Sequence, residues 1–323
     1  MKHIYDLRRC LLCPRRCGAD RASGPGGYCG ETAELRVASA SIHRGEEPIL
    51  TGTGGSGTVF VTGCNLGCVF CQNYQISRQG MGRPVKAEEF AAIALRLQEL
   101  GAENINIVTG SHAVPAIAAG IDAARKGLRI PVLWNSSAYE SSGALELLKD
   151  RVDVYLPDLK TLDADVSERF FKTPGYGEAA AAAILRMMEY RPLRYAGGVL
   201  ESGVIVRHLA LPGYLDSTRR VLRWFAGHCR GRALLSLMTQ YTPVRPLGEK
   251  ENTGMPDRFI NRGEYETLIR WLDEFGIDEG FCQEPLRGEG WLPDFRRENP
   301  FSSDLSLPVW HWRFGFINCP GSL

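Results

Sequence analysis

Short apolar runs alternate with helical stretches between residues 57 and 275, and no other feature of the sequence restricts the fold as strongly. The runs are apolar along most of their length, which is typical of parallel strands that are buried on both faces. A helical pattern follows each of the six runs, which span residues 57–62, 104–109, 130–135, 152–158, 203–211 and 233–240.

Six β–α units predict an α/β fold with a parallel sheet. Periodicity alone does not decide whether such a sheet closes part-way into a TIM-like barrel or stays open and doubly wound. We expect a partial TIM-like (β/α)6 parallel barrel with a small metal-binding module at its N-terminus. In both architectures the chemistry takes place at the carboxyl ends of the strands.

Three regions of different composition divide the chain. Residues 1–48 show little periodicity and are rich in Cys, Gly, Pro and Arg, so we expect a module in which bound metal replaces a hydrophobic core. Residues 49–250 form the predicted α/β core, and its Gly-rich stretch at 52–57 is expected to be a turn because it precedes a strand. Residues 251–323 are predicted to form a last helix and an extension that covers the barrel as a cap or an extra strand.

The charge of the chain is nearly balanced, with 38 Lys and Arg residues against 37 Asp and Glu residues. Such a balance favours neither nucleic acid nor a membrane surface as a partner. No apolar stretch approaches the roughly 20 residues that a membrane-spanning helix needs, and the first residues lack the apolar segment of a secretory signal. We therefore expect a cytoplasmic protein without nucleic acid or membrane partners.

Ten cysteines are present, and seven of them precede residue 72. Closely spaced thiols in a reducing compartment suit metal ligation, whereas disulfides usually join residues that are distant in sequence. The clustering therefore predicts metal sites. We expect the three isolated cysteines to be small core residues, namely Cys229, Cys282 and Cys319.

Cys64, Cys68 and Cys71 form a C-x3-C-x2-C loop directly after the first apolar run. Three thiolates can ligate three irons of a [4Fe–4S] cluster, which leaves the fourth iron open to another ligand. A structural zinc ion is the alternative, but it prefers four ligands, often in paired C-x2-C units. The loop therefore predicts a cluster at the end of a strand, where such folds keep their active sites.

This loop resembles that of the radical S-adenosylmethionine (SAM) superfamily, in particular relatives of pyruvate formate-lyase activating enzyme. The resemblance rests on the three cysteines, on Phe70 before the last of them and on the β–α order over 57–245. It implies that the open iron binds SAM and that the reduced cluster releases a 5′-deoxyadenosyl radical, which abstracts a substrate hydrogen. It also implies a low-potential electron donor of the flavodoxin or ferredoxin type. Phe70 is expected to lie against the adenine, and Gln72 and Asn73 are expected to orient the loop.

Polar residues follow the later apolar runs and are candidates for binding SAM. The second run ends at Thr109, Gly110 and Ser111, where the resembling enzymes carry a Gly-Gly-Glu turn that this chain lacks. Gly110 still permits a close backbone approach, whereas Ser111 could instead cap a helix. At the end of the fourth run, Asp158 and Lys160 resemble an Asp-Leu-Lys that lies near SAM in pyruvate formate-lyase activating enzyme, with a structural ion pair as the alternative.

Three further strand ends contribute candidates. Within the fifth run we expect Arg207 to face inward as a partner of the SAM carboxylate and the adjacent His208 to face outward, because neighbouring residues of a strand point to opposite faces. The remaining candidates are Asn135, followed by Ser136 and Ser137, and Gln240, followed by Tyr241.

The N-terminal cysteines Cys10, Cys13, Cys17 and Cys29 are spaced C-x2-C-x3-C-x11-C and form a complete set of four ligands. Tetrahedral zinc would fold the small module outright. A second [4Fe–4S] cluster would instead relay electrons or bind substrate. Both remain open, because pyruvate formate-lyase activating enzyme has no such module and the resemblance is to its relatives.

The predicted function is that of a radical SAM oxidoreductase of the activating-enzyme type. A glycine of a partner protein, a peptide and a small molecule are all candidate substrates, because the loops that read the substrate vary freely among enzymes of one fold. The alternative from another class is a non-catalytic iron–sulfur electron-transfer protein or a zinc-binding interaction protein.

Overall fold

The computed structural model describes residues 6–244, 254–285 and 292–317. Its strands are β1 (Arg36–His43), β2 (Ser56–Val61), β3 (Arg83–Pro84), β4 (Ile105–Val108), β5 (Val132–Ser136), β6 (Val154–Pro157), β7 (Arg194–Ala196), β8 (Val199–Leu209), β9 (Leu234–Met238), β10 (Gly280–Cys282), β11 (Ser306–His311) and β12 (Gly315–Phe316). Its helices are α1 (Pro48–Thr51), α2 (Tyr74–Ser77), α3 (Ala87–Glu99), α4 (Val114–Ala124), α5 (Ser142–Leu148), α6 (Ala164–Phe171), α7 (Tyr176–Tyr190), α8 (Leu215–His228) and α9 (Arg262–Glu274), and a 3-10 helix spans Leu7–Arg9.

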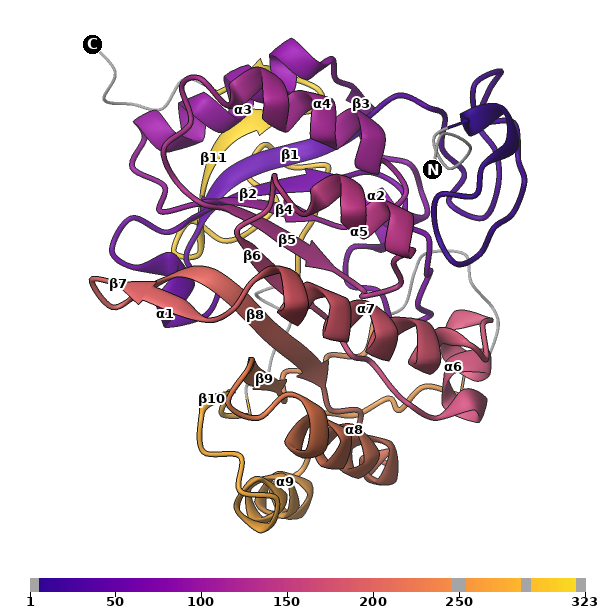
Figure 1. Cartoon of the computed structure of the whole chain (residues 1–323), viewed down its shortest axis with the longest axis vertical. Coiled ribbons are helices and arrows are strands. Elements are labelled where there is room, and N and C mark those ends of the chain that lie inside the picture. Colours follow the sequence, from indigo (N-terminus) through magenta and orange to yellow (C-terminus); the bar gives the residue numbers. More distant parts are fainter. Residues whose placement is uncertain (1–5, 245–253, 286–291, 318–323) are drawn as a thin grey trace.

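The strands form one sheet in the order β10-β9-β8-β6-β5-β4-β2-β1-β11-β12, with β3 beside β1 and β7 beside β8. Along this order every neighbouring pair from β10 to β2 is parallel, whereas β1 runs antiparallel to both β2 and β11. The short strand β7 runs antiparallel to β8. Within the described residues β10 and β12 do not pair with each other, so the sheet is not closed into a barrel. The predicted α/β fold with a mostly parallel, partly barrel-like sheet is confirmed (Figure 1).

The six predicted strands are β2, β4, β5, β6, β8 and β9, and their residues are almost all buried. Helices α3, α4, α5 and α7 lie in front of the sheet in Figure 1 and cover one of its faces. Helix α3 buries an apolar stripe with helical spacing, which includes Phe90, Ile93 and Leu97. The expected alternation of strand and helix therefore builds the layers that position the site.

The two faces of the sheet bury separate sets of side chains. Trp134 and Tyr155 belong to the main core, which the helices cover. Leu133 and Leu156, one residue earlier or later on the same strands, pack with Leu50 of α1 in a second, smaller core. We call the face that carries Leu133 and Leu156 the inner face, because residues two apart on a strand share a face.

Two segments outside the six β–α units complete the sheet. Strand β1 comes from the N-terminal region 1–48, so this region is more than a metal-binding module. Strand β11, from the C-terminal extension, pairs antiparallel with β1. The three-region division of the chain otherwise stays a prediction. The stretch at 52–57 turns between α1 and β2, with left-handed backbone at Gly52 and Gly55 (φ +47° and +90°), as expected.

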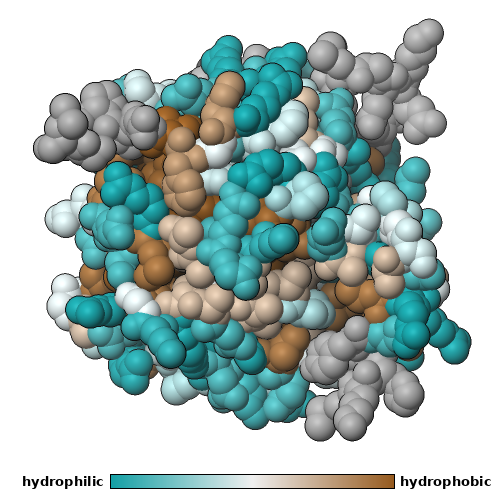
Figure 2. Space-filling model, turned by 90° about the horizontal axis from the view of Figure 1, so that it is seen from above, coloured by the Kyte–Doolittle hydropathy of each residue, from teal (hydrophilic) through white to brown (hydrophobic). Residues whose placement is uncertain are grey.

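The surface is mixed in character. Seen from above the orientation of Figure 1, hydrophobic side chains lie in the middle of the molecule, and hydrophilic side chains border and cross them (Figure 2). Among the described residues, none of the helices has the length and apolarity needed to cross a membrane.

Candidate active site

The cysteine loop follows β2 in the chain and ends at α2, so it lies at the carboxyl end of the parallel sheet. Two glycines shape it, because Gly63 and Gly67 have left-handed backbone with φ +87° and +71°, which other residues adopt only at a cost. The guanidinium of Arg78 lies over Gly67, where a side chain would collide with it. The loop is therefore turned tightly between its first and second cysteines.

The three thiols of this loop are buried or half-buried and influence one another electrostatically. Burial raises the pKa of the Cys68 and Cys71 thiols, so ligation of a metal would have to release their protons. The Cys64 sulfur accepts a hydrogen bond from the Leu66 amide at 3.4 Å, and the Cys71 sulfur lies 3.3 Å from the Ser77 hydroxyl.

This donor set fits a cluster with one open iron, because three neighbouring thiols on one loop can each ligate a different iron. Among the described residues, no group of three or more His, Cys, Asp or Glu side chains is arranged around a single metal ion. The ligand roles of Cys64, Cys68 and Cys71 therefore rest on the chemistry of the donors and on their place in the fold.

Asp158 and Lys160 form an ion pair beside the cysteine loop, with 2.8 Å between carboxylate and ammonium. Burial alone would lower the pKa of the Lys160 ammonium, but the Asp158 carboxylate and the Cys68 thiol raise it above its usual range. The Tyr176 hydroxyl accepts a hydrogen bond from the Lys160 amide at 3.0 Å and donates one to the Asp158 carbonyl at 2.6 Å. The end of β6 is thus held rigidly next to Cys68.

Phe70 is buried in a group of aromatic rings between the cysteine loop and its neighbours. Its ring meets those of Phe170, Phe171 and Tyr241 edge to face, at centroid distances of 6.2, 5.9 and 6.4 Å. Edge-to-face contacts of this kind stabilise buried aromatic clusters. The predicted contact of Phe70 with adenine stays a prediction.

The ends of β4 and β5 meet at the predicted SAM-binding turn. The Thr109 amide donates to the Asn135 carbonyl at 2.8 Å, and Thr109 itself has a left-handed backbone with φ +65°. A non-glycine residue in this conformation is strained and is often found at functional sites. Gly110 packs closely against Trp134, because a Cβ atom there would lie 2.5 Å from the indole ring.

Ser111 does not point freely into an open site. Its hydroxyl donates to a Glu140 carboxylate oxygen at 2.6 Å, and the Trp134 indole donates to the same oxygen at 3.1 Å. Burial raises the pKa of Glu140, and its second carboxylate oxygen has no hydrogen-bond partner among the described residues. Glu140 was not among the sequence candidates, although an acid soon after a buried strand could have suggested it.

Arg207 lies on the inner face, because it is two residues beyond Ile205 of the smaller core. Its guanidinium pairs with the carboxylates of Glu46 and Glu47, including an Nε–oxygen distance of 2.9 Å to Glu47. Burial opposes ionisation of Glu47, but Arg207 holds its pKa below the usual range. Neither glutamate was a candidate from sequence, and the signal that could have found them is the pair of adjacent acids before Pro48.

His208 points to the opposite face, as expected. Its ring nitrogens lie 2.7 Å from the Leu159 carbonyl and 3.0 Å from the Thr218 hydroxyl of α8. Burial lowers the pKa of His208 to about 4, so the ring is neutral at pH 7. The residue is a satisfied core histidine that joins β8 to the end of β6.

The last two candidates lie at the edges of this group. Asn73 caps α2 with its backbone carbonyl, which accepts from the amides of Ile76 and Ser77 at 3.1 and 2.9 Å. Gln240 follows the end of β9, is half-buried and precedes Tyr241 of the aromatic group. The predicted contacts of both residues with SAM stay predictions.

The N-terminal cysteines lie together at the same end of the molecule. The N-terminal segment, shown in indigo, is on the side toward which the arrows of β5 and β8 point (Figure 1). Its four thiols line one small pocket, whose other lining residues are Leu12, Arg15, Arg21, Tyr28, Asn65 and His112. The four cysteines thus line one pocket, and their predicted role as ligands of a shared metal stays a prediction.

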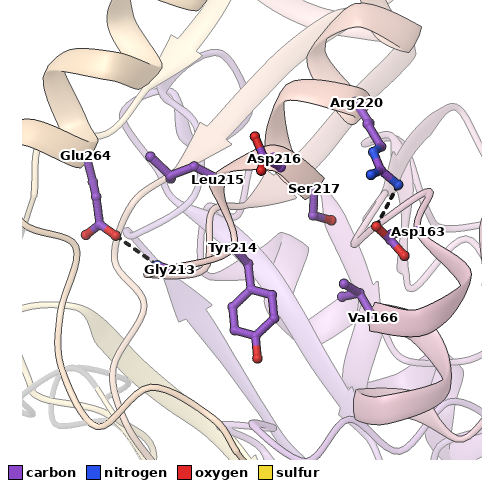
Figure 3. Close-up of a pocket in the computed structure, with 9 residues that line it drawn as sticks. All are labelled: Asp163, Val166, Gly213, Tyr214, Leu215, Asp216, Ser217, Arg220 and Glu264. Atoms are coloured by element: carbon purple, nitrogen blue, oxygen red, sulfur yellow. Dashed lines mark hydrogen bonds and ion pairs between the residues drawn. The ribbon is translucent and has the colours of Figure 1, made fainter.

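A second, open pocket lies beside the starts of α6 and α8 (Figure 3). The Asp163–Arg220 ion pair at 2.7 Å closes one side of it, and a hydrogen bond of 2.8 Å from the Gly213 amide to Glu264 closes the other. Tyr214 points into it, and its ring also contacts Phe170 at 5.1 Å. None of the predicted SAM-binding residues lines this pocket.

Comparison with known proteins identifies relatives of this chain. The sequence profile of the radical SAM superfamily matches residues 58–224, just over half of the 323 residues. The uncharacterized protein MJ0674 of Methanocaldococcus jannaschii is 28% identical over 284 residues, which cover 86% of this chain and 77% of that protein.

The fold is similar to that of SuiB from Streptococcus suis. The structure of SuiB bound to S-adenosylmethionine has a TM-score of 0.50 at 12% identity and covers 68% of this chain and 48% of SuiB. The structure of SuiB bound to the precursor peptide SuiA has a TM-score of 0.51 at 13% identity and covers 69% and 47%. This chain thus spans about half the length of SuiB, and the likeness concerns the fold alone.

The profile match runs from β2 to α8 and includes the three-cysteine loop and the ends of β4, β5, β6 and β8. The chain therefore belongs to the radical SAM superfamily, a family of enzymes that use S-adenosylmethionine and a [4Fe–4S] cluster.

Proposed function

We propose that this protein cleaves SAM reductively at a [4Fe–4S] cluster held by Cys64, Cys68 and Cys71 and uses the resulting 5′-deoxyadenosyl radical for hydrogen abstraction. The observation that carries the proposal is the meeting of these three thiols with the Asp158–Lys160 pair at the carboxyl end of the parallel sheet. When bound, the cluster supplies one electron to the sulfonium of SAM.

The surrounding residues are proposed to hold SAM and to exclude water. The aromatic group around Phe70 gives the loop an apolar wall, which protects a radical from side reactions. Nε and Nη2 of Arg207 are engaged with Glu46 and Glu47, so Nη1 is the donor proposed to reach the SAM carboxylate. The full proposed set is Phe70, Asn73, Thr109, Gly110, Ser111, Asn135, Asp158, Lys160, Arg207 and Gln240.

For the substrate we propose a peptide or protein, and a glycine of a partner protein is the first candidate, as the resemblance of the loop to activating enzymes implies. The structure of SuiB with its precursor peptide supports testing peptides as well. We further propose a flavodoxin- or ferredoxin-type electron donor and a cytoplasmic location, because all the described cysteines are free thiols, as in a reducing compartment.

The test is direct. The protein is purified without oxygen, reconstituted with iron and sulfide, and incubated with dithionite and SAM, and 5′-deoxyadenosine and methionine are quantified. We expect both products in equal amounts. A fully reconstituted protein that forms neither product would instead support the alternative of a non-catalytic electron-transfer or zinc-binding protein.

The N-terminal thiols of Cys10, Cys13, Cys17 and Cys29 are proposed to hold a second metal centre, either zinc or an iron–sulfur cluster. Their common pocket supports one shared centre. Burial raises the pKa of the Cys13 thiol to about 11, so metal binding there would also release protons.

A further inference from the structure

The pocket of the N-terminal cysteines and the cysteine loop share a wall. Asn65 follows Cys64 directly in the loop, yet it lines the N-terminal pocket, where its amide interacts with the Cys13 thiol. The amide nitrogen of Asn65 also donates to the Tyr139 carbonyl at 2.8 Å, which fixes the side chain in place. A single residue therefore separates a ligand of one proposed centre from a ligand of the other.

Arg15, which lies between Cys13 and Cys17, holds this contact together. Its guanidinium donates to the carbonyls of Asn65 and Leu66 at 2.6 and 3.0 Å, both of which lie inside the cysteine loop. It stacks on the Tyr28 ring, with 3.3 Å from Cζ to the ring centroid. The N-terminal segment thus clamps the backbone between two proposed cluster ligands.

Arg21 brings a buried positive charge to the same pocket. Its side chain donates to the carbonyls of Glu31, Thr32 and His112 at 3.0, 2.6 and 2.7 Å, and it lies 3.7 Å from the Cys10 sulfur. It is only 1% exposed, and its charge acts on the Cys29 thiol and on the Glu31 carboxylate, which Arg36 already pairs at 3.2 Å. A buried charge needs a counter-ion, and thiolates around a metal form an anion.

Two buried polar atoms of the residues that line the pocket are also unsatisfied. In the described residues, Nδ1 of His112 and Oδ1 of Asn65 make no hydrogen bond. Nε2 of His112 faces the Thr62 carbonyl at 2.8 Å and must carry the ring hydrogen, so Nδ1 is a bare lone pair. Buried lone pairs without a donor are costly, so the described residues leave the polar atoms of this pocket incompletely satisfied.

We propose that this pocket holds a redox-active iron–sulfur cluster, ligated by Cys10, Cys13, Cys17 and Cys29, that relays single electrons through the shared wall to the cysteine loop. Three close cysteines followed by a distant fourth are typical of cluster ligation, whereas structural zinc favours paired C-x2-C units. Zinc has no redox chemistry and could relay nothing.

The electron balance of the relay is simple. A low-potential donor of the flavodoxin or ferredoxin class is oxidised by one electron and reduces the N-terminal cluster. That electron passes to the cluster of the cysteine loop and then into the sulfonium of SAM, whose bond to C5′ breaks to give methionine and the 5′-deoxyadenosyl radical. The relay rests on the proposed function, whereas the metal content of the pocket does not.

The first experiment isolates the N-terminal centre. The full-length triple variant Cys64→Ala, Cys68→Ala, Cys71→Ala is purified without oxygen, and its iron, acid-labile sulfide and zinc are measured. We expect iron and sulfide together with an electron paramagnetic resonance (EPR) signal after reduction. Adding Cys10→Ser and Cys13→Ser should abolish the signal, whereas Cys282→Ser, outside both groups, should not. Zinc alone, or no metal, would overturn the proposal even if the wild-type protein cleaves SAM.

The second experiment tests the shared wall. In the fully reduced wild-type protein the two paramagnetic clusters should broaden each other's EPR signals and relax faster than in variants that keep only one cluster. A spectrum that equals the sum of the two single-cluster spectra would refute the relay. If the broadening is present but no 5′-deoxyadenosine forms, the relay geometry stands and the proposed function fails.

Discussion

The two groups of cysteines lie side by side, but they differ in the number of thiols and in the cations near them. The loop behind β2 offers three thiols, and a lysine ammonium from a strand end lies near one of them. The N-terminal pocket offers four thiols, and two arginines line it. A set of three leaves a coordination position for a reactant, whereas a set of four is complete. Under the proposed function, the first group performs the chemistry and the second supports it.

The largest expected effect would come from breaking the three-thiol set. Replacing Cys68 by Ala leaves too few ligands for the cluster, so 5′-deoxyadenosine formation should fall below detection, measured by mass spectrometry. Cys229→Ala, a buried cysteine outside both groups, serves as the control and should retain product formation. A Cys68→Ala protein with wild-type turnover would remove the distinction between the two regions.

Arg21→Met should damage the N-terminal pocket and leave the cysteine loop intact. Three carbonyls, two of them buried, lose their donor, and the thiolates of the proposed metal centre lose a counter-charge, so we expect a loss of about 3 kcal/mol in the free energy of unfolding. Urea denaturation and metal analysis measure both effects. The exposed Arg9→Met should change stability by less than about 0.5 kcal/mol. Equal loss of metal from both sites would show that the regions are one unit.

Acid should destabilise the fold because it protonates His208, which joins β8 to the end of β6. The pKa of His208 is lowered to about 4 from its usual 6.5, so the unfolded chain binds more protons between these values. This contribution is complete above pH 6.5 and is lost as the pH falls to 4, about 3 kcal/mol in all.

The measurement for this prediction is the unfolding free energy of wild type and His208→Gln across that pH range. The variant should show a flatter decline, while the exposed His228→Gln should follow the wild type. Parallel curves for wild type and His208→Gln would mean that other groups cause the acid sensitivity.

Gly67→Ala should give the smallest loss of stability, and it should disturb contacts in both regions. A left-handed backbone costs a non-glycine residue about 1–2 kcal/mol, and the new methyl group would also push Arg78 away from the Tyr28 hydroxyl at 2.9 Å. Gly231→Ala is the matched control, with φ +73° and open space around the new atom. We expect Gly67→Ala to lose more stability than this control in urea unfolding. An equal loss would show that the Arg78 side chain moves aside without an energetic cost.

The sequence predicted the six buried strands well, because parallel strands covered on both faces are continuously apolar. It missed β1, whose sequence RVASASIH consists half of Ala and Ser and shows no continuous apolar run, although six of its eight positions are buried. It also missed Glu46 and Glu47 as partners of Arg207. The ion pair spans about 160 residues, and no local pattern reports such a contact.

The sequence by itself determined the donors: three thiols behind a strand, four thiols in the N-terminal segment and an acid and a lysine at the end of another strand. These features depend only on residue type and on short spacing, both of which are present in the chain before it folds. Only the tertiary structure decided that the two cysteine groups share Asn65, that Arg15 clamps the loop from 50 residues away and that Arg207 is already paired. Such contacts depend on how the whole chain folds around the sheet, because a close approach of distant segments is a property of packing and not of local sequence.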